Sequence, residues 1–459
     1  MKGPHAALPS LLMLAMTAAG LAGCDLDSHG PDPASSPTRF APAAAPMAPS
    51  SPRNAAELFD ELAAPRDFRI LVAPQDWAWL QDNALAEEYV PAEVQFEGKV
   101  FPGAAVRYKG GYGSLYACFD DQGNRLCPKL SLKVRFNKDD PDGRFLGLRR
   151  LVFNSNNRDE TALRERLAYA TFRAAGLPAP RAVHARVQVN DEAPSLYTLV
   201  EDIDHEFLED RFEDPDGNLL KEAWPGNPDV ATWINALETN EDAPDVSRMT
   251  TFAEVLAGTA DHPEGFPEAM APWVDAEALV RYLAVDMAAA DWDGIMKFYC
   301  SGPWCGNHNF HVYDDPTTGR FVVIPWDLDH TFEYPDRDLG RSWSDDGPEA
   351  CAIVQIAPTI GIRAPQCDPL LGGIWRHYEG SFLDHLAELS APGGPLSLEV
   401  RLGLLDRYRA MILPLLEDDP LGPELPDWRR ATARLREALA AQDAEIRLRL
   451  AERVDRPGP

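Results

Sequence analysis

Two aspartates follow an apolar stretch in "FVVIPWDLDHTF", which covers residues 321–332. Asp327 and Asp329 lie two positions apart, and neighbouring carboxylates raise each other's cost of ionisation unless a positive group lies near them. Mg²⁺ supplies such a charge, because it is usually held by one or two carboxylates together with phosphate oxygens. The pair therefore predicts a metal site with Asp327 as a ligand. Asp329 is either a second ligand or the cap of the next turn.

Two more carboxylates and an amide lie upstream, in "DWDGIMKFYCSGPWCGNHNF". Asp291 and Asp293 come first, and Asn309 stands before an apolar run. Phosphoryl transfer requires little covalent chemistry from a protein, but it requires a metal between phosphates and a carboxylate that orients the attacking hydroxyl. The acids of both segments are suited to that reaction.

Groups that could contact phosphates occur in two segments of the first half of the chain. Gly110 and Gly111 in "YKGGYG" would let backbone amides approach an anion. Lys129 and Lys133 in "PKLSLKVRF" are predicted to share one face of a strand, because side chains alternate along a strand. The structural alternatives are a Gly-Gly hairpin turn and exposed strand lysines.

Several enzyme classes are excluded because the chain lacks their motifs. It contains no G-x-x-x-x-G-K-[ST] loop, which excludes a P-loop NTPase, and no G-x-S-x-G or H-E-x-x-H. His308, His311 and His330 cluster around the strand-like runs "NFHVYDD" and "RFVVIPWD" and could suggest a transition-metal site, but strand alternation places them inconsistently. We therefore interpret these histidines as ordinary polar positions.

The bulk composition limits the partners. A chain of 459 residues predicts one large two-lobed domain or two domains, and 45% hydrophobic residues suffice for a globular interior. The net charge of −30 argues against nucleic acid, which is itself a polyanion. An acidic surface is compatible with solubility outside the cell and with a basic protein partner.

The N-terminus predicts export. Residues 1–23 are typical of a lipoprotein signal peptide, since an apolar run ends in "LAGC" and makes Cys24 the expected lipidated residue. Residues 24–64 are rich in Pro, Ala and Ser and predict a disordered tether. No later apolar run is long enough to span a bilayer. We expect a lipoprotein anchored to a membrane through Cys24, facing the periplasm or the cell surface.

The other six cysteines fall into three local pairs, as disulfides formed in an oxidising compartment would. No C-x-x-C and no Cys-His cluster with ligand spacing occurs, so a zinc site is rejected. The predicted disulfides are Cys118–Cys127, Cys300–Cys305 and Cys351–Cys367.

The expected secondary structure changes near residue 205, from mainly strands to mainly helices. Residues 65–204 read as short strands with one helix, "DETALRERLAYATFRAAG", capped by Asp159 or a neighbouring Asn and stopped by Gly176. Residues 205–459 read as mostly helical. They include "DAEALVRYLAVDMAAADW", a long amphipathic final helix, and the strand pair "NFHVYDD" and "RFVVIPWD" joined by a "PTTG" turn.

The order of these segments resembles the CotH family of spore-coat kinases, relatives of the atypical secretory-pathway kinases. The resemblance covers residues 67–335 roughly and is carried by "VRYKGGYG", "PKLSLKVRF", "LVFNSNNRDETALRERLAYATFRAAGLPAPRAVHARVQVN", "YTLVEDIDHEFL", "GNLLK", "NHNFHVY" and "IPWDLDHTF". It implies an α+β, two-lobed protein-kinase-like fold. Residues 65–204 would form a β-rich N-lobe with one helix, and residues 205–459 a mostly helical C-lobe.

The resemblance also implies roles for individual residues. By this match Asp293 is the catalytic base, Asn309 and Asp327 hold the metal, and Asp291 is a structural cap or backup. Among the remaining matched positions, Lys129 would contact phosphate, Arg164 would organise the site, and Glu201 and Asp202 would lie at the hinge near the nucleotide. The implied cofactor is ATP, or another nucleotide, with Mg²⁺ or Mn²⁺. The chain departs from the family by an insertion with Cys300 and Cys305 between base and ligand.

The leading hypothesis is a metal-dependent phosphotransferase that acts on Ser or Thr of an exported or surface protein. ATP is scarce outside the cytoplasmic membrane, so another donor, or another transfer such as nucleotidylation, is an alternative on the same fold. A catalytically inert coat or adhesion lipoprotein is the alternative of a different class. A metal-dependent hydrolase is the weakest hypothesis, because suitably arranged histidine ligands are missing.

Overall fold

The structure is a computed structural model that describes residues 51–111, 113–302, 304–333, 339–344 and 349–455. The predicted signal peptide, Cys24 and the tether up to residue 50 lie outside the described residues, and those predictions stay untested. No helix in the described part of the chain is both long and apolar enough to cross a membrane.

Seven strands in the first half of the chain form a closed barrel in the order β1-β2-β3-β4-β5-β7-β6. All neighbours pair antiparallel except β1 and β6, which are parallel. Aromatic rings fill the interior, where the centroids of Phe68 and Phe96 are 4.6 Å apart. The strands are β1 Arg66–Val72, β2 Val90–Phe96, β3 Lys99–Tyr108, β4 Leu132–Arg135, β5 Arg150–Asn154, β6 Ala182–Val189 and β7 Ser195–Val200.

The folded part begins before residue 65, where the sequence places the end of the tether. Asn54 caps the short helix α1 Ala55–Leu58, and Leu58 and Phe59 are buried in the barrel core. The region 65–204 also has a helix besides the expected one, α2 Pro74–Asp82, which starts with proline at its first position. The expectation of a single helix there is therefore wrong, because α2 is short and weakly amphipathic and gives little periodic signal.

The expected helix in this region is α3 Arg164–Ala174. Asp159 accepts a hydrogen bond from the Arg164 amide at 2.7 Å, and Gly176, at φ +79°, ends the helix as the sequence predicts. Leu163 and Leu167 are fully buried, so α3 is held by packing.

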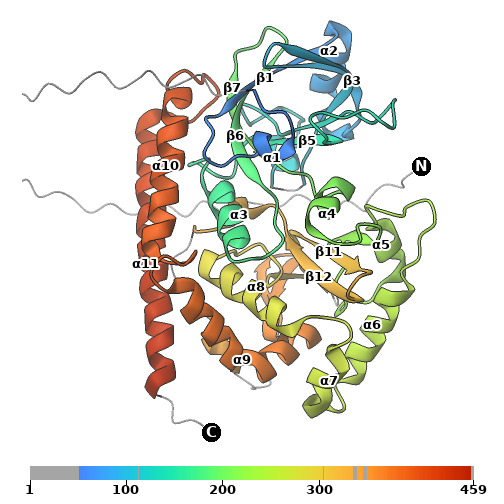
Figure 1. Ribbon diagram of the computed structural model, residues 1–459, viewed down its shortest axis with the longest axis vertical. Helices are drawn as coiled ribbons and strands as arrows, with labels where there is room; N and C mark the ends of the chain where they lie inside the picture. The colour runs from blue at the N-terminus through green and yellow to red at the C-terminus, as the bar shows by residue number, and fades with distance from the viewer. Residues whose placement is uncertain (1–50, 112, 303, 334–338, 345–348, 456–459) are drawn as a thin grey trace, which may run out of the picture. The chain divides into compact units, whose positions relative to one another are not determined.

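The second half of the chain is mainly helical. Asp204 caps α4, and Asp275 caps α8. Figure 1 shows α10 and α11 lying side by side as two long helices. The helices are α4 His205–Arg211, α5 Val230–Asn235, α6 Ser247–Gly258, α7 Phe266–Met270, α8 Ala276–Ala289, α9 Pro369–Ser390, α10 Leu398–Glu417 and α11 Leu425–Asp455.

Two small sheets complete this half. One has the order β12-β11-β8 and contains the predicted strand pair, and the other has the order β10-β9-β14-β13. The strands are β8 Leu219–Lys221, β9 Phe298–Ser301, β10 Trp304–Gly306, β11 Phe310–Asp315, β12 Arg320–Pro325, β13 Val354–Ala357 and β14 Ile360–Arg363. A 3₁₀ turn, η4 Leu328–His330, follows β12.

The three predicted disulfides are confirmed: Cys118–Cys127, Cys300–Cys305 and Cys351–Cys367 are bonded. The mixed α+β class is also confirmed. Buried side chains form two clusters, one in the barrel and one in the helical half that includes α3. The two-lobed kinase-like arrangement stays a prediction.

Candidate functional site

Asp293 and Asn309 are brought together. The Asn309 Nδ2 atom donates hydrogen bonds to the Asp293 carboxylate and to the Asp293 backbone carbonyl, both at 3.0 Å. Asn309 has a φ of +62°, a left-handed conformation that asparagine tolerates better than most residues. Asn309 therefore orients the carboxylate of Asp293, the residue that the family resemblance implies as the base.

Asp291 acts as the cap of the turn that carries Asp293. Its carboxylate accepts a hydrogen bond from the Asp293 amide at 3.2 Å. A Cβ atom at Gly294 would lie 2.3 Å from the Asp291 carboxylate, so only glycine allows residue 294 to pack this closely against Asp291. Burial, and then the charge of Asp293, raise the pKa of Asp291 to about 7.

Asp327 lies next to this pair because β11 and β12 are hydrogen-bonded neighbours. The Trp326 amide donates to the Asn309 carbonyl at 3.0 Å, which fixes the start of β11 against the end of β12. The Asp327 amide donates to the Tyr169 hydroxyl of α3, also at 3.0 Å. Asp327 has a φ of +55°, so the chain turns sharply at this residue into η4.

A further carboxylate, which is buried and is not among the predicted site residues, comes from α3. Glu165 is 2% exposed, and burial followed by the charges of Asp327 and Asp329 raises its pKa well above the ordinary value. Burial and Asp327 likewise raise the pKa of Asp329 to about 8. The carboxylates of these three residues therefore share one electrostatic environment, as the opening pair of aspartates predicts.

Lys109 of the "VRYKGGYG" segment is not among the predicted site residues, but it faces these acids. The Lys109 ammonium donates to Asn154 Oδ1 at 2.8 Å and lies 5.5 Å from the centroid of the Trp326 ring. Asn154 in turn donates to both carboxylate oxygens of Glu165 at 2.9 Å. Burial lowers the pKa of Lys109, and the charge of Asp327 opposes that shift. Lys109 is thus the cation that approaches the acids from the barrel.

Ion pairs border the acids on the α3 side. The Arg164 guanidinium pairs with Glu333 and Asp159, and Trp292 donates its indole N–H to Glu333. His330 lies 3.4 Å from Glu333, a contact that raises the pKa of His330 to about 9 despite burial. These contacts tie α3 to the segments around Asp293 and Asp327.

Lys129 lies elsewhere. Its ammonium donates to the Leu196 carbonyl and, at 3.0 Å, to the Ser195 hydroxyl, and it pairs with Asp419 at 3.6 Å. The expectation that Lys129 and Lys133 share a strand face is wrong, because β4 begins only at Leu132. Strand alternation therefore does not extend back to residue 129.

Lys133 and Glu201 are engaged in other ion pairs. Lys133 lies 2.9 Å from Asp202, which also pairs with Arg150. Glu201 is 3% exposed. Both of its carboxylate oxygens accept hydrogen bonds from two arginines, Arg181 directly before β6 and Arg211 at the end of α4. Burial, and after it charges that include that of Lys133, lower the pKa of Lys109, so the two ammonium groups influence each other.

The predicted glycine turn follows Lys109 directly. Gly110 has a φ of +142°, and a Cβ atom there would lie 2.4 Å from the Ser114 hydroxyl, so the turn requires glycine. The Gly111 carbonyl accepts hydrogen bonds from the amides of Leu115 and Tyr116. Contact of this turn with a phosphate stays a prediction.

The acids around Asp327 do not form a complete metal cage of protein side chains in the described residues. In the parts of the chain described above, no three His, Cys, Asp or Glu side chains form a group that could hold a metal ion. Mg²⁺ is commonly held by one or two carboxylates plus phosphate oxygens, so a complete protein cage is unnecessary. Burial, followed by the charges of neighbouring carboxylates, raises the pKa values of Glu165 and Asp329, and a bound cation would offset the repulsion between these acids.

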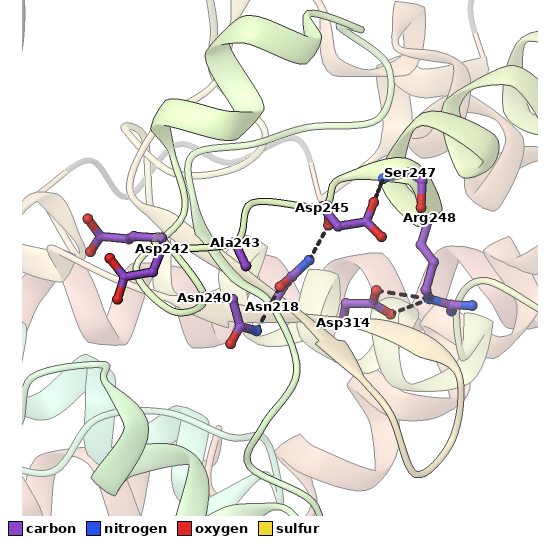
Figure 2. Close-up of a pocket in the computed structure, with 9 residues that line it drawn as sticks. Asn218, Asn240, Asp242, Ala243, Asp245, Ser247, Arg248 and Asp314 are labelled. Atoms are coloured by element: carbon purple, nitrogen blue, oxygen red, sulfur yellow. Dashed lines mark hydrogen bonds and ion pairs between the residues drawn. The ribbon is translucent and has the colours of Figure 1, made fainter.

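A separate pocket of about 530 Å³ lies near the opposite end of β11 from Asn309. Figure 2 shows Asp314 of β11 paired with Arg248, and Asp245 capping the start of α6 through the Ser247 amide. The lining is mostly polar and acidic: Asn218, Asn240, Glu241, Asp242, Ala243, Asp245, Ser247, Arg248 and Asp314. None of the predicted site residues lines this pocket.

Comparison with known proteins identifies the class of the chain. The family described as CotH kinase protein matches residues 106–432, and the chain belongs to this family. The chain is 21% identical over 276 residues to inner spore coat protein H of Bacillus subtilis (strain 168), which covers 58% of this chain and 68% of the relative. The family resemblance deduced from the sequence is therefore confirmed.

Among solved structures, the Helicobacter pylori proinflammatory kinase CtkA matches 71% of this chain and 94% of its own. Its sequence identity is 9% and the TM-score is 0.34.

Proposed function

We propose that the chain is a phosphotransferase of the CotH kinase family that uses a nucleotide with Mg²⁺ or Mn²⁺ and modifies a Ser or Thr hydroxyl. The observation that carries this proposal is the meeting of four groups from distant segments. Lys109 comes from the barrel, Asp293 and Asn309 flank the β9–β10 hairpin, and Asp327 follows β12. Family membership supports the same reaction class.

In this proposal Asp293 is the general base. It takes the proton from the substrate hydroxyl while the hydroxyl oxygen bonds to the γ-phosphorus, and the bond between that phosphorus and the departing nucleoside diphosphate breaks. Asn309 holds the Asp293 carboxylate in place through the 3.0 Å hydrogen bond. A carboxylate held in this way does not have to reorganise when the hydroxyl arrives.

Asp327 and Asn309 would hold the metal, with Asp329 as a further ligand. The ion would neutralise phosphate charge while the nucleotide is bound. Lys109 takes the phosphate-contacting role that the family resemblance implies for Lys129. Asn154, which itself donates to Glu165 of α3, accepts a hydrogen bond from the Lys109 ammonium and orients it. Protein kinases use a comparable lysine and helix glutamate as a direct pair.

The proposed substrate is an exported or surface protein, with a basic segment favoured by the net charge of −30. Support for export comes from the "LAGC" signal and from the three disulfides, which are typical of oxidising compartments. Anchoring through Cys24 belongs to the same proposal. The curated relative is named as a spore coat protein, which is compatible with a surface location.

Label transfer tests the proposal. The purified chain is incubated with γ-labelled ATP, Mg²⁺ or Mn²⁺, and a basic Ser/Thr-containing protein, and the acceptor residues are identified by mass spectrometry. We expect metal-dependent phosphate on Ser or Thr. Label on the protein only from α-labelled ATP would indicate nucleotidylation, and absence of any transfer or nucleotide binding would favour an inert coat protein.

Two lysine variants distinguish the two candidate phosphate contacts. Lys109→Met is expected to weaken ATP binding by about 10- to 100-fold, since a charge-assisted hydrogen bond contributes roughly 1.5–3 kcal/mol. Lys129→Met leaves the Asp419 carboxylate without its cationic partner, although the Ser195 hydroxyl and the Leu196 amide still donate to it. We therefore expect a loss of about 1–3 kcal/mol in the free energy of unfolding, with the ATP affinity of the folded protein unchanged.

The measurements are calorimetric ATP titration and chemical denaturation of both variants. If Lys129→Met weakened ATP binding while Lys109→Met did not, Lys129 would be the phosphate contact, as the family resemblance implies.

A further inference from the structure

The carboxylate of Asp293 is held from two sides. Asn309 donates to Oδ2, and the Tyr299 hydroxyl donates a short hydrogen bond to Oδ1. Tyr299 belongs to β9, in the insertion by which this chain departs from the family pattern. No motif in the sequence selects this tyrosine, because the contact depends on how the hairpin folds back onto the turn before it.

Tyr299 is fixed on both sides of its strand. It pairs with Gly306 of β10 and with Ile362 of β14. The next residue, Cys300, lies opposite Cys305 and is bonded to it, so the disulfide closes the hairpin directly beside the tyrosine. A side chain on such a closed hairpin has little freedom to leave Asp293.

The Tyr299 hydroxyl remains a hydrogen-bond donor. Burial, followed by the charge of Asp293, raises the pKa of Tyr299 far above its ordinary value. The hydroxyl therefore keeps its proton in the neutral range and cannot itself serve as a base. What it can do is fix the direction in which the second carboxylate oxygen presents its free lone pair.

We propose that Tyr299 is a positioning residue for Asp293, which holds the carboxylate toward the substrate hydroxyl through its Oδ1 atom. This inference rests on the proposed function, because it assigns Asp293 the role of base. Together, Tyr299 and Asn309 leave the carboxylate one orientation. The insertion thereby supplies a rigid support for the base.

Tyr299→Phe tests this role in the full chain, since it removes only the hydroxyl. We expect kcat for label transfer to fall by about 10- to 100-fold, a part of the roughly 10²–10⁴-fold that a general base contributes. The dissociation constant of ATP with Mg²⁺ should stay unchanged, because the Tyr299 side chain contacts Asp293 and the ring of His308, and neither residue is a proposed ligand of ATP or of the metal. A merely structural role would not produce this separation of kcat from nucleotide binding.

The matched control is Tyr313→Phe. The Tyr313 hydroxyl also makes two hydrogen bonds, since it donates to the Asp214 backbone carbonyl and accepts from the Gly217 amide, but it lies further along β11 and away from Asp293. We expect Tyr313→Phe to lower thermal stability without lowering kcat.

A double-mutant cycle makes the test specific. In the Asp293→Asn background, single-turnover rates should be the same with Tyr or Phe at position 299, because no base remains to be positioned. Equal kcat for Tyr299→Phe and the unsubstituted chain, or an additive loss in the Asp293→Asn background, would overturn the inference and leave the proposed function standing. An unsubstituted chain without transfer would instead overturn the proposed function, so the two failures give different results.

Discussion

Asp327→Ala is expected to weaken ATP binding in the presence of Mg²⁺ by at least about 100-fold, which corresponds to about 2.7 kcal/mol. The reason is that Asp327 is the carboxylate that would link the metal to the rest of the site. The Asp327 amide is anchored to the Tyr169 hydroxyl and the Trp326 amide to the Asn309 carbonyl, so the backbone that carries the Asp327 carboxylate is held in place. Calorimetric titration with ATP at saturating Mg²⁺ measures the effect.

Two further variants complete this prediction. Asp242→Ala removes an exposed carboxylate from the separate pocket of Figure 2 and is expected to leave ATP affinity unchanged. Asp329→Ala distinguishes a second ligand, whose loss weakens binding, from a turn residue, whose loss does not. Unaltered ATP affinity in Asp327→Ala would mean that the metal ligand has been misassigned.

Asp293→Asn is expected to lower kcat for transfer by about 10²–10⁴-fold while ATP still binds with its metal. Asparagine has the same shape as aspartate but cannot accept the proton of the substrate hydroxyl. Single-turnover label transfer and calorimetric titration on the same preparation separate the two effects. Loss of ATP binding together with transfer would indicate that Asp293 holds the metal and is not the base.

Asp291→Asn is the matched control for that change. The Asp291 carboxylate caps the turn by accepting from the Asp293 amide, and an asparagine oxygen can accept the same hydrogen bond. We therefore expect near-normal transfer from Asp291→Asn. A decrease in the transfer rate as large as that of Asp293→Asn would identify Asp291 as the catalytic base and not only as the cap of the turn.

The sequence predicts those parts of the site that depend on local pattern. Asp327 follows an apolar strand, Asn309 opens the strand beside it, and pairing of β11 with β12 then suffices to bring the two residues together. The three disulfides link cysteines close in sequence. Gly176 marks the end of α3 as predicted, whereas the helix starts only at Arg164, five residues after the predicted cap Asp159.

Other parts depend on packing between distant segments and leave no local pattern. Glu165 lies between Arg164 and Arg166 in a segment predicted only to be helical, but its side chain is buried next to Asn154 of β5 and the acids around η4. Lys129 has the expected residue type and spacing, but a loop before β4 carries it to Asp419, a residue 290 positions later. The signal for Lys109 is its place directly before the glycine turn.

The central claim is that groups from both halves of the chain form one nucleotide site completed by a divalent ion. Titration of the unsubstituted chain with ATP, once with Mg²⁺ and once with EDTA, tests this claim most directly. We predict saturable binding with Mg²⁺ and at least about tenfold weaker binding with EDTA. Equal affinity under both conditions, or no ATP binding with either Mg²⁺ or Mn²⁺, would contradict it.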